Sequence, residues 1–525
     1  MAAVNESYDK TGDLDDIEMN SMGAARKKED IGRYSYEEAL DLTGHGKYNL
    51  GLLMACFMVI TAMGIDIFGL GIIVTAATCD LGMGLAEIGV LSSMPFAGII
   101  VMSYPWGYLS DTRGRKLVLM WAMCGSFLSS VFSSFAPNWQ MLAAFRFISS
   151  ALSSAAESAT YALLGECCAA RLRARYMLLV TSALMITPTI YYVWGYLIMK
   201  LDFSFQFLAI VYRPWRLLTQ VMALPLGLGA LMLYFYSESP KFLANVGRNE
   251  ESIDVLKRIY VKNGGDEKDF PVKEIYLLDG STEEVGEFSL RSLWTQIAPL
   301  FKPPLLTRTI LLYYLTFVIY IANNSFAIIL PTIFNVFFTS YATSAADASF
   351  CDLFALSNST TVDETETQVQ DASVCTDTIN DLTILAGCVH GLSFFVLNAL
   401  ISQCAHKRKA MTIVIMVIAA AAAVGLNNLQ QPIAGLALFY VYLTTAMVFG
   451  VVSSYFVDLF PTSYRGMVAC VGMMVARLSA FFGTNIVSRA MTDHCHETMY
   501  GAAGLVISGA VAASFLPADT NVFPN

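Results

Sequence analysis

The chain has 525 residues, of which 56% are hydrophobic and 14% are charged. The apolar residues form blocks of about twenty, the length that crosses a hydrocarbon layer. This pattern excludes a soluble multidomain protein and predicts a polytopic membrane protein that has the lipid bilayer as a partner. The formal net charge of −10 is concentrated in the polar segments, and no nucleic-acid partner is predicted.

The N-terminal tail, residues 1–48, precedes the first apolar block. Residues 1–30 are acidic and poor in large apolar side chains, so we predict that they are disordered. Ser35 and Glu38 have the spacing of a helix-capping box, which predicts a short amphipathic helix before the membrane. No cleavable signal peptide is predicted, and the first span is expected to direct insertion itself.

Twelve predicted membrane spans follow in two groups of six, which gives an all-α polytopic fold class. We expect an N-terminal bundle at 49–236, a cytoplasmic linker with short amphipathic helices at 237–307, a C-terminal bundle at 308–516 and a short cytoplasmic tail at 517–525. The predicted spans are 50–78, 88–108, 117–136, 139–162, 176–199, 216–236, 308–338, 379–402, 411–427, 432–455, 466–489 and 498–516.

Lysine and arginine residues indicate the orientation, because they are retained on the cytoplasmic side of a membrane. They cluster after spans two, four and eight and in the linker, whereas residues 309–406 contain neither. Both termini are therefore predicted to be cytoplasmic, and the acidic loop 339–378 is predicted to be luminal.

The luminal loop contains two candidate sites of covalent modification. Asn358 begins a usable glycosylation sequon, although such a triplet also occurs by chance. Cys351 and Cys375 are a candidate disulfide pair in an oxidising lumen. Both features suit a loop on the luminal side.

The two halves carry an internal repeat. Glu166 and Asp458, 292 residues apart, are each followed seven residues later by an arginine, Arg173 and Arg465. The same offset places the cations after span two on those after span eight. Repeats in parallel register, joined by a cytoplasmic linker, are the layout of transporters whose halves rock about a midplane site.

The stretch GYLSDTRGRK, residues 107–116, resembles the loop motif of the major facilitator superfamily, with Thr112 in place of an arginine. Residues 237–243 and 460–462 are similar to stretches of the sugar and organic-ion porters of that superfamily. The resemblance implies twelve helices in two halves and transport by alternating access. The matched motif positions are Gly107, Asp111, Gly114, Arg115 and Lys116.

Within the superfamily the chain looks most like the synaptic vesicle glycoprotein 2 and related-protein branch. Residues 36–44 and 212–216 are similar to that branch, and the long loop after span seven matches its loop placement. Organic cation and anion transporters usually carry their large loop between spans one and two. The 40 residues of 339–378 are too few for a full repeat-rich luminal domain. We expect a monomer in a vesicle or plasma membrane.

Charged residues inside apolar spans are candidates for a substrate or ion cavity, since an ionised group in hydrocarbon costs about 3 kcal/mol or more. Asp66 in span one is a candidate proton or cation site. Arg146 and Glu157 share one stripe of span four. Arg477 in span eleven is a candidate to hold an anionic group or to pair with Asp66 or Glu157. For each residue the alternative is a structural role among neighbouring helices.

His390 in span eight and the pair Asn323 and Asn324 in span seven complete the candidate cavity. A histidine titrates near neutral pH, although a satisfied interior histidine is the alternative. The two asparagines are candidates for substrate contact or for hydrogen bonds between helices.

Charged residues at the cytoplasmic ends of the spans form a candidate gate. By the resemblance, Asp111 binds the start of span eleven and latches the outward-facing state. Arg115 and Lys116 are then expected to lie close to Glu166 and Glu238. The candidate gate residues are Gly107, Asp111, Gly114, Arg115, Lys116, Glu166, Arg173, Glu238, Asp458, Arg465 and Gly466.

No phosphate-binding loop or pair of nucleophile and base stands out, so we predict no enzymatic activity and no cofactor. Residues 493–496, DHCH, look like a metal cluster but lack a second ligand pair at the usual spacing, so no metal is predicted. The first functional hypothesis is a transporter of a small organic or ionic solute, coupled to protons or cations through Asp66 or Glu157. The alternatives are a transport-silent regulator of a vesicle membrane and an organic cation or anion transporter.

Overall fold

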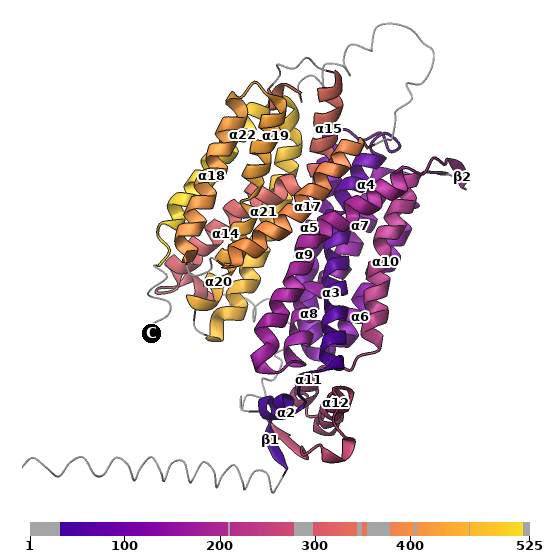
Figure 1. Ribbon diagram of the computed structural model, residues 1–525, viewed down its shortest axis with the longest axis vertical. Helices are drawn as coiled ribbons and strands as arrows, with labels where there is room; N and C mark the ends of the chain where they lie inside the picture. Colours follow the sequence, from indigo (N-terminus) through magenta and orange to yellow (C-terminus); the bar gives the residue numbers. More distant parts are fainter. Residues whose placement is uncertain are drawn as a thin grey trace, which may run out of the picture.

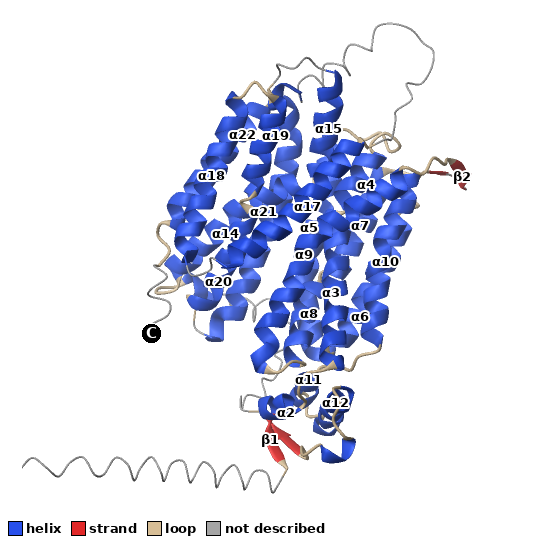
Figure 2. Cartoon of the chain, viewed as in Figure 1, coloured by secondary structure: helices blue, strands red, loops and turns tan. Residues whose placement is uncertain are grey.

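The computed structural model describes residues 32–207, 210–277, 298–343, 349–353, 379–403, 407–460 and 462–517. These residues form an elongated bundle of helices with two short pairs of strands at its margins (Figure 1, Figure 2). The helices run up and down through the bundle, as the blocks of apolar residues predict.

The N-terminal half is drawn in indigo to magenta in Figure 1. Two of its spans are interrupted, the first at Gly69 and the fourth at Ser154. The Ser154 hydroxyl donates to the carbonyl of Ala151, 2.8 Å away, and such back-bonding bends helices. The helices are α3 (Lys47–Phe68), α4 (Leu70–Ala77), α5 (Leu85–Arg113), α6 (Arg115–Ser133), α7 (Trp139–Ser153), α8 (Ala155–Glu166), α9 (Ala170–Met199) and α10 (Pro214–Tyr234).

The C-terminal half lies beside it in salmon, orange and yellow (Figure 1). Its spans seven and ten are again each made of two helices. The helices are α14 (Leu306–Ala327), α15 (Leu330–Thr343), α17 (Asp381–Gln403), α18 (Arg408–Asn428), α19 (Pro432–Leu443), α20 (Ala446–Asp458), α21 (Thr462–Asp493) and α22 (Cys495–Ala513).

Within the described residues, ten helical stretches are long and apolar enough to cross a membrane. The two further spans are α7 with α8, which carries Arg146, Glu157 and several serines, and α22. They run alongside the other ten in Figure 1. Two groups of six spans result, and the break in span four makes each of its two helices short.

The end of the bundle from which α3 starts carries a small unit built from the N-terminal tail and the central linker. Strand β1 (Arg33–Ser35) pairs in parallel with β4 (Glu274–Tyr276). Helix α2 (Tyr36–Leu42) starts with the capping box of Ser35 and Glu38. The linker adds α11 (Pro240–Asn245), α12 (Asn249–Lys262) and the 3₁₀ turns η1 (Glu267–Asp269) and η2 (Ala298–Phe301).

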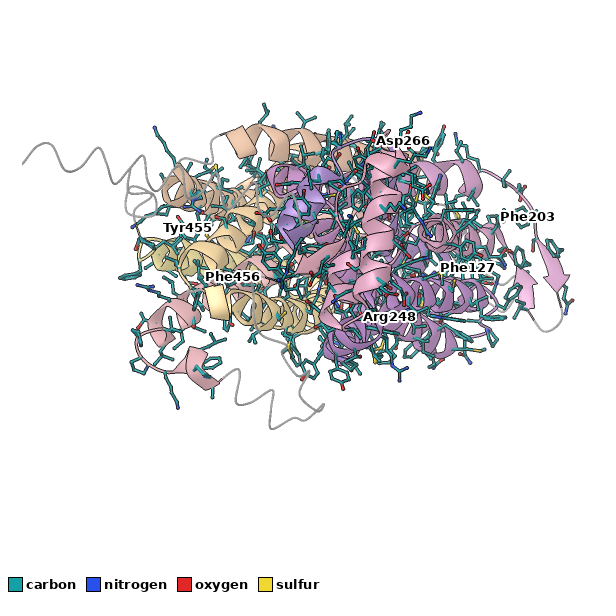
Figure 3. All side chains as sticks on the ribbon, turned by 90° about the horizontal axis from the view of Figure 1, so that it is seen from below. Phe127, Phe203, Arg248, Asp266, Tyr455 and Phe456 are labelled. Carbon is teal, nitrogen blue, oxygen red and sulfur yellow. A yellow bond between two sulfur atoms is a disulfide. The ribbon has the colours of Figure 1, made fainter. Side chains whose placement is uncertain are left out.

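We call residues 33–43 with 240–276 the tail–linker unit, and the end of the bundle that carries it the linker end. Its core contains Tyr36, Leu40 and Leu256, all buried. Figure 3 views this end and shows α12 lying across the ends of the N-terminal helices. The sequence predicts the short helices, but it does not predict that the tail and the linker form one unit through β1 and β4.

The opposite end of the bundle, which we call the disulfide end, holds the two halves together. Thr75 of α4 and Thr332 of α15 share a hydrogen bond of 2.8 Å between their hydroxyls. A Cβ on Gly89 would lie 1.9 Å from the hydroxyl of Ser488, so glycine permits α5 and α21 to approach closely. Nearer the linker end of α5, a Cβ on Gly107 would meet nothing within 4 Å.

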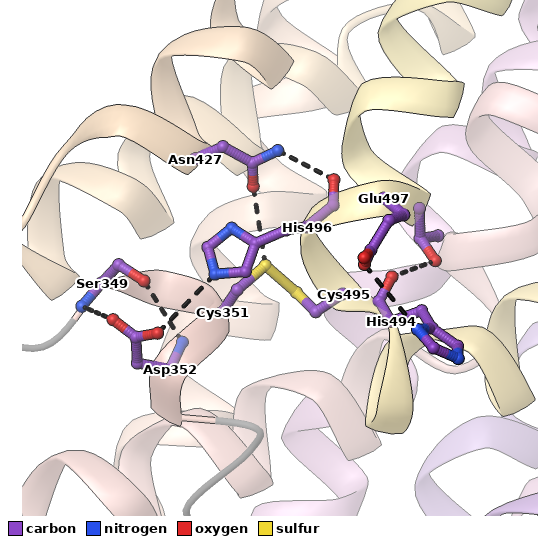
Figure 4. The surroundings of a disulfide bond; sticks show 9 residues. Ser349, Cys351, Asp352, Asn427, His494, Cys495, His496 and Glu497 are labelled. Atoms are coloured by element: carbon purple, nitrogen blue, oxygen red, sulfur yellow. Dashed lines mark hydrogen bonds and ion pairs between the residues drawn. A yellow bond between two sulfur atoms is a disulfide. The ribbon is translucent and has the colours of Figure 1, made fainter.

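The pairing of Cys351 with Cys375 is a wrong prediction. Cys351 is bonded to Cys495 at the start of α22, 144 residues further along the chain (Figure 4). Cys79 is also disulfide-bonded. The fold brings the start of the loop after α15 next to α22, a proximity that spacing along the sequence does not reveal. Cys375 and Asn358 lie outside the described residues.

Polar contacts surround this disulfide. Asp352 accepts a hydrogen bond from the backbone N–H of Ser349 at 2.9 Å, and its own backbone N–H donates to the Ser349 hydroxyl at 3.2 Å. Hydrogen bonding by Ser349 lowers the pKa of the Asp352 carboxyl. His496 lies 3.6 Å from the same carboxylate. A carboxyl with a lowered pKa stabilises the folded state while it is ionised, and this contribution is lost as the pH falls through the folded-state pKa.

We predict that Cys495→Ser destabilises the C-terminal half. The cross-link closes a loop of 144 residues, for which chain entropy gives about 5 kcal/mol as an upper value, since the bilayer already confines the unlinked spans. Non-reducing peptide mapping of the parent protein should recover Cys351 joined to Cys495. Recovery of Cys351 joined to Cys375 would contradict the structure, and a Cys495→Ser melting temperature equal to the parent's would contradict the stabilising role.

Candidate functional site

An ion pair lies inside the N-terminal half, between α3 and α7. Arg146 Nη1 lies 3.2 Å from Asp66 Oδ1, and the two residues are 1% and 2% exposed. Ser149 donates to both carboxylate oxygens, at 2.9 and 3.0 Å. Ser150 and Ser153 donate to Oδ2 at 3.4 and 3.3 Å. The Asp66 carboxylate therefore has hydrogen-bond donors on successive turns of α7, from Arg146 to Ser153.

The guanidinium of Arg146 is held from α6 as well. Its Nη1 donates to the hydroxyl of Ser130, 3.2 Å away, whereas its Nε and Nη2 have no hydrogen-bond partner among the described atoms. Asp66 and Arg146 were predicted to line a cavity. In this conformation both lie among helices of one half and neither is open to solvent.

A second ion pair joins the two halves. Arg477 Nη2 of α21 lies 2.6 Å from Glu157 Oε1 in the first turn of α8. The Arg477 side chain is 8% exposed and that of Glu157 is 28% exposed, so the carboxylate borders open space. Tyr320 of α14 lies within electrostatic range of both charges. Of the two partners that the sequence leaves open for Arg477, the structure brings it to Glu157.

The remaining candidate cavity residues lie in the C-terminal half. Asn323 donates to the side chain of its neighbour Asn324 at 2.8 Å. The ring of His390 lies 4.2 Å from that of Phe394 and 5.6 Å from that of Tyr440, centroid to centroid. None of the contacts between described residues joins these groups to the Glu157–Arg477 pair.

The candidate gate residues gather at the linker end around Arg115. Its guanidinium lies 3.1 Å from Asp111 and 3.2 Å from Glu166. Glu238 accepts the backbone N–H of Lys116 at 2.8 Å and that of Leu117 at 3.1 Å. These N–H groups belong to the first turn of α6, which has no internal partners for them, so Glu238 caps the helix and neutralises its positive end.

Gly114 makes this arrangement geometrically feasible. It lies at the reversal from α5 to α6 with φ of +106°, a conformation that other residues rarely adopt. A Cβ at this position would lie 2.5 Å from Glu238 Oε2. A glycine is therefore required both by the backbone conformation and by the carboxylate that approaches it.

The same cluster reaches the tail–linker unit. Ser239 donates its hydroxyl to Glu166, and Arg173 lies 2.9 Å from Glu37 of α2. Neither Glu37 nor Ser239 is among the gate residues that the sequence predicts. Ser239 lies inside the stretch 237–243 and Glu37 inside the stretch 36–44, both of which carry the family resemblance, but neither stretch indicates a contact partner. The structure does not describe what surrounds Asp458, Arg465 and Gly466, and the contact of Asp111 with the start of span eleven stays a prediction.

Two six-helix halves that meet at one end and share an ion pair inside the membrane define a multi-pass membrane protein of the transporter class. Residues 54–484 match the Major Facilitator Superfamily, which is well over half of the 525 residues. The chain belongs to this superfamily. The predicted fold class of twelve helices in two halves is confirmed, and the family is not enzymatic.

Among curated proteins, the chain is similar to the synaptic vesicle glycoproteins 2. It is 27% identical over 254 residues to synaptic vesicle glycoprotein 2C of Mus musculus, covering 46% of this chain and 34% of the relative. It is 25% identical over 277 residues to synaptic vesicle glycoprotein 2B of Homo sapiens, covering 50% and 39%. The chain thus spans less than half of the length of these relatives. The predicted likeness to this branch is confirmed as a distant one.

Solved structures with the same fold cover most of the chain. A D-xylose-proton symporter superposes with a TM-score of 0.62 at 16% identity, covering 90% of this chain and 99% of the symporter. A bacterial homologue of the human lysosomal transporter Spinster, in an inward-facing and unoccupied conformation, gives a TM-score of 0.59 at 11% identity, covering 91% and 98%. At these identities the likeness establishes the fold.

We predict that Gly114→Ala destabilises the protein by about 1–3 kcal/mol, because it combines a strained backbone with a clash against Glu238. The matched control is Gly107→Ala in the same motif, which fills open space inside a helix and should be neutral or slightly stabilising. Melting temperatures in detergent measure both. Equal melting temperatures for the two variants would contradict the role assigned to Gly114.

Proposed function

We propose that this protein is a secondary transporter that moves a small organic or ionic solute across the membrane by alternating access. The observation that carries the proposal is the Glu157–Arg477 pair, which joins the two halves near the middle of their spans. A solute that binds one of these charges competes with the other, so binding weakens a contact between the halves. Rocking of the halves would then follow occupancy.

The linker end is the cytoplasmic end in this proposal, because the lysines and arginines of the loops concentrate there. Between the described residues, the contacts that join the halves lie at the opposite end and around the middle of the spans, among them Thr75 with Thr332 and Gly89 with Ser488. This distribution supports an inward-facing state, with the disulfide end closed.

Asp66 is the proposed coupling site. Protonation removes the charge that holds Arg146, so the ion pair and its serine donors would rearrange inside the N-terminal half. Because the pair is buried, protonation of Asp66 has a large effect on it, since a charge without its partner is costly in a low dielectric. The likeness in fold to a D-xylose-proton symporter supports a proton as the coupling ion.

A second function has support from the relatives. The matched curated proteins are synaptic vesicle glycoproteins 2, and the tail–linker unit offers a folded surface outside the membrane. A transport-silent regulator of a vesicle membrane would use that surface and would need no exchange of midplane partners. A panel of sugars, organic ions, nucleotides and monoamines, screened by thermal shift at two pH values and then by uptake, separates the two functions, since the regulator shows no gradient-driven uptake.

For the solute found in that screen, Asp66→Asn should abolish accumulation driven by a proton gradient. Exchange of labelled for unlabelled solute without a gradient should continue, because the amide mimics the protonated acid. Proteoliposomes with and without an imposed pH gradient measure both rates. Asp254→Asn, an exposed acid on α12, is the control. Accumulation by Asp66→Asn that still follows the pH gradient would contradict the coupling role.

Glu157→Gln and Arg477→Ala should each lower uptake about tenfold or more, because each leaves its partner unpaired at a site of low dielectric. The exchanged pair, Glu157→Arg with Arg477→Glu, should restore the melting temperature of the parent but not uptake, since the solute meets its charges in reversed positions. Melting curves and uptake are measured on the same preparations. Full uptake by either single variant would show that the Glu157–Arg477 pair has no role in the transport cycle.

Asp111→Asn should shift the resting population toward the inward-facing state, because the proposed latch of the outward-facing state is lost. Cys470 of α21 is an exposed thiol and serves as the reporter. Its alkylation from the linker side should become faster in Asp111→Asn, with the labelling of a Cys470→Ser background subtracted. An unchanged rate would count against the gate.

A further inference from the structure

A short hairpin between α9 and α10 presents a face of aromatic rings. Strands β2 (Phe205–Phe207) and β3 (Ile210–Tyr212) are antiparallel, with Phe205 opposite Tyr212. Residues opposite each other share a face of the hairpin, and so do residues two apart. The ring centroids of Phe203, Phe205 and Tyr212 lie 5.2–6.3 Å apart.

The other face of the hairpin is more polar. Ser204 and Gln206 alternate with the aromatic residues and are exposed. The rest of the protein covers the aromatic face only in part: the ring of Phe135 lies 6.3 Å from that of Tyr212, centroid to centroid, but Phe205 is 52% exposed. From Phe203 to Tyr212 the chain has no charged residue. A two-stranded hairpin is only marginally stable in water without a surface to pack on. We therefore expect an apolar partner to stabilise this amphipathic hairpin.

The membrane-facing surface of α9 continues onto the hairpin. Val193, Leu197 and Leu201 follow one another at four-residue spacing and are 42%, 59% and 46% exposed. This is the pattern of a helix face turned to lipid. Phe205, at 52% exposed, extends the exposed apolar surface beyond the helix end, whereas Val211 lies opposite Gln206 on the other face. The exposed apolar residues thus continue from the lipid-facing surface of α9 to the hairpin. The connection between them is too short to place the hairpin far from the membrane.

The hairpin also projects sideways rather than away from the bundle. Figure 1 shows β2 beyond α10 at the height of α4, and Figure 3 shows Phe203 at the outer margin of the N-terminal half. At its base, Asp80 accepts a hydrogen bond from the indole of Trp215 at 3.0 Å and lies 3.3 Å from Arg216. Trp215 and Arg216 are buried, so these contacts fix the base of the hairpin to the start of α10. The hairpin joins the ends of two candidate membrane spans, Leu179–Met199 and Pro214–Tyr234, and its base therefore lies at the edge of the membrane.

We propose that this hairpin lies along the membrane at the disulfide end, with the rings of Phe203, Phe205 and Tyr212 in the interfacial layer of the lipid bilayer. The polar face, with Ser204 and Gln206, is turned to water. Because the hairpin has no charge between Phe203 and Tyr212, insertion depends on apolar and aromatic contact, and anionic lipid is not required. The proposal does not depend on whether the protein transports a solute.

The experiment compares two single variants on opposite faces, Phe205→Trp and Gln206→Trp, in the full-length protein reconstituted into phosphatidylcholine vesicles. The added fluorescence is the difference from the parent protein. For Phe205→Trp we expect blue-shifted emission, loss of most of the added signal in lipid brominated near the headgroup, and little quenching by iodide. For Gln206→Trp we expect strong quenching by iodide and little by brominated lipid. Adding phosphatidylserine should leave both patterns unchanged.

Two results would overturn the proposal. Equal iodide quenching of the two variants, without quenching by brominated lipid, places both faces in water. The emission of Phe205→Trp could instead be blue-shifted but insensitive to brominated lipid, and shift to the red when the ratio of protein to lipid is lowered. That result assigns the aromatic face to a second copy of the chain. Melting temperatures equal to the parent's show that both variants are folded, and Val211→Trp provides a further probe of the hairpin if one of them is not.

Discussion

Asp66 and Arg146 hold opposite charges 3.2 Å apart inside the N-terminal half, where neither side chain reaches solvent. Removing water from two such charges costs several kcal/mol each, and their attraction offsets this only when further hydrogen bonds satisfy them. The serines of α7 supply those bonds to Asp66, whereas Ser130 of α6 supplies one to Arg146 and leaves its Nε and Nη2 without a partner among the described atoms. Helices α3, α6 and α7 are thereby held in one arrangement, since sliding any of them would leave a charge without partners. The N-terminal half can then move as one body.

The Glu157–Arg477 pair uses the same chemistry for the opposite purpose. It lies between two bodies, and its carboxylate borders open space, where the proposed solute would take the place of one partner. A pair enclosed within one half gives rigidity, whereas a pair between halves is a contact that can be exchanged. A contact without charges joins the halves at the disulfide end, because Gly89 lets α5 and α21 approach closely there. Rigid halves and exchangeable contacts are what a rocking mechanism requires.

The sequence predicted the twelve spans well, because the length of each apolar block is imposed by the membrane and needs no tertiary information. It also drew attention to Arg115, Glu166 and Glu238, since charged residues at span ends stand out against apolar sequence. It could not predict partners. Arg146 and Glu157 were assigned to one stripe of a continuous helix, but the break at Ser154 separates them, and each pairs with a different helix. The partner of Cys351 is likewise set by how α15 and α22 pack.

The cluster at the linker end shows why a charge-rich motif can serve more than topology. Cations alone would be enough to keep this loop on one side of a membrane, and they would require neither Gly114 nor an acid. Here Glu238 caps α6 at a position that only a glycine permits, Arg115 connects Asp111 to Glu166, and Ser239 connects Glu166 to the linker. A displacement of α5 against α6 must therefore break contacts of Arg115 and Glu238, which also connect α8 and the first residues of the linker. The position of that unit and the conformation of the N-terminal half are coupled through the same few carboxylates.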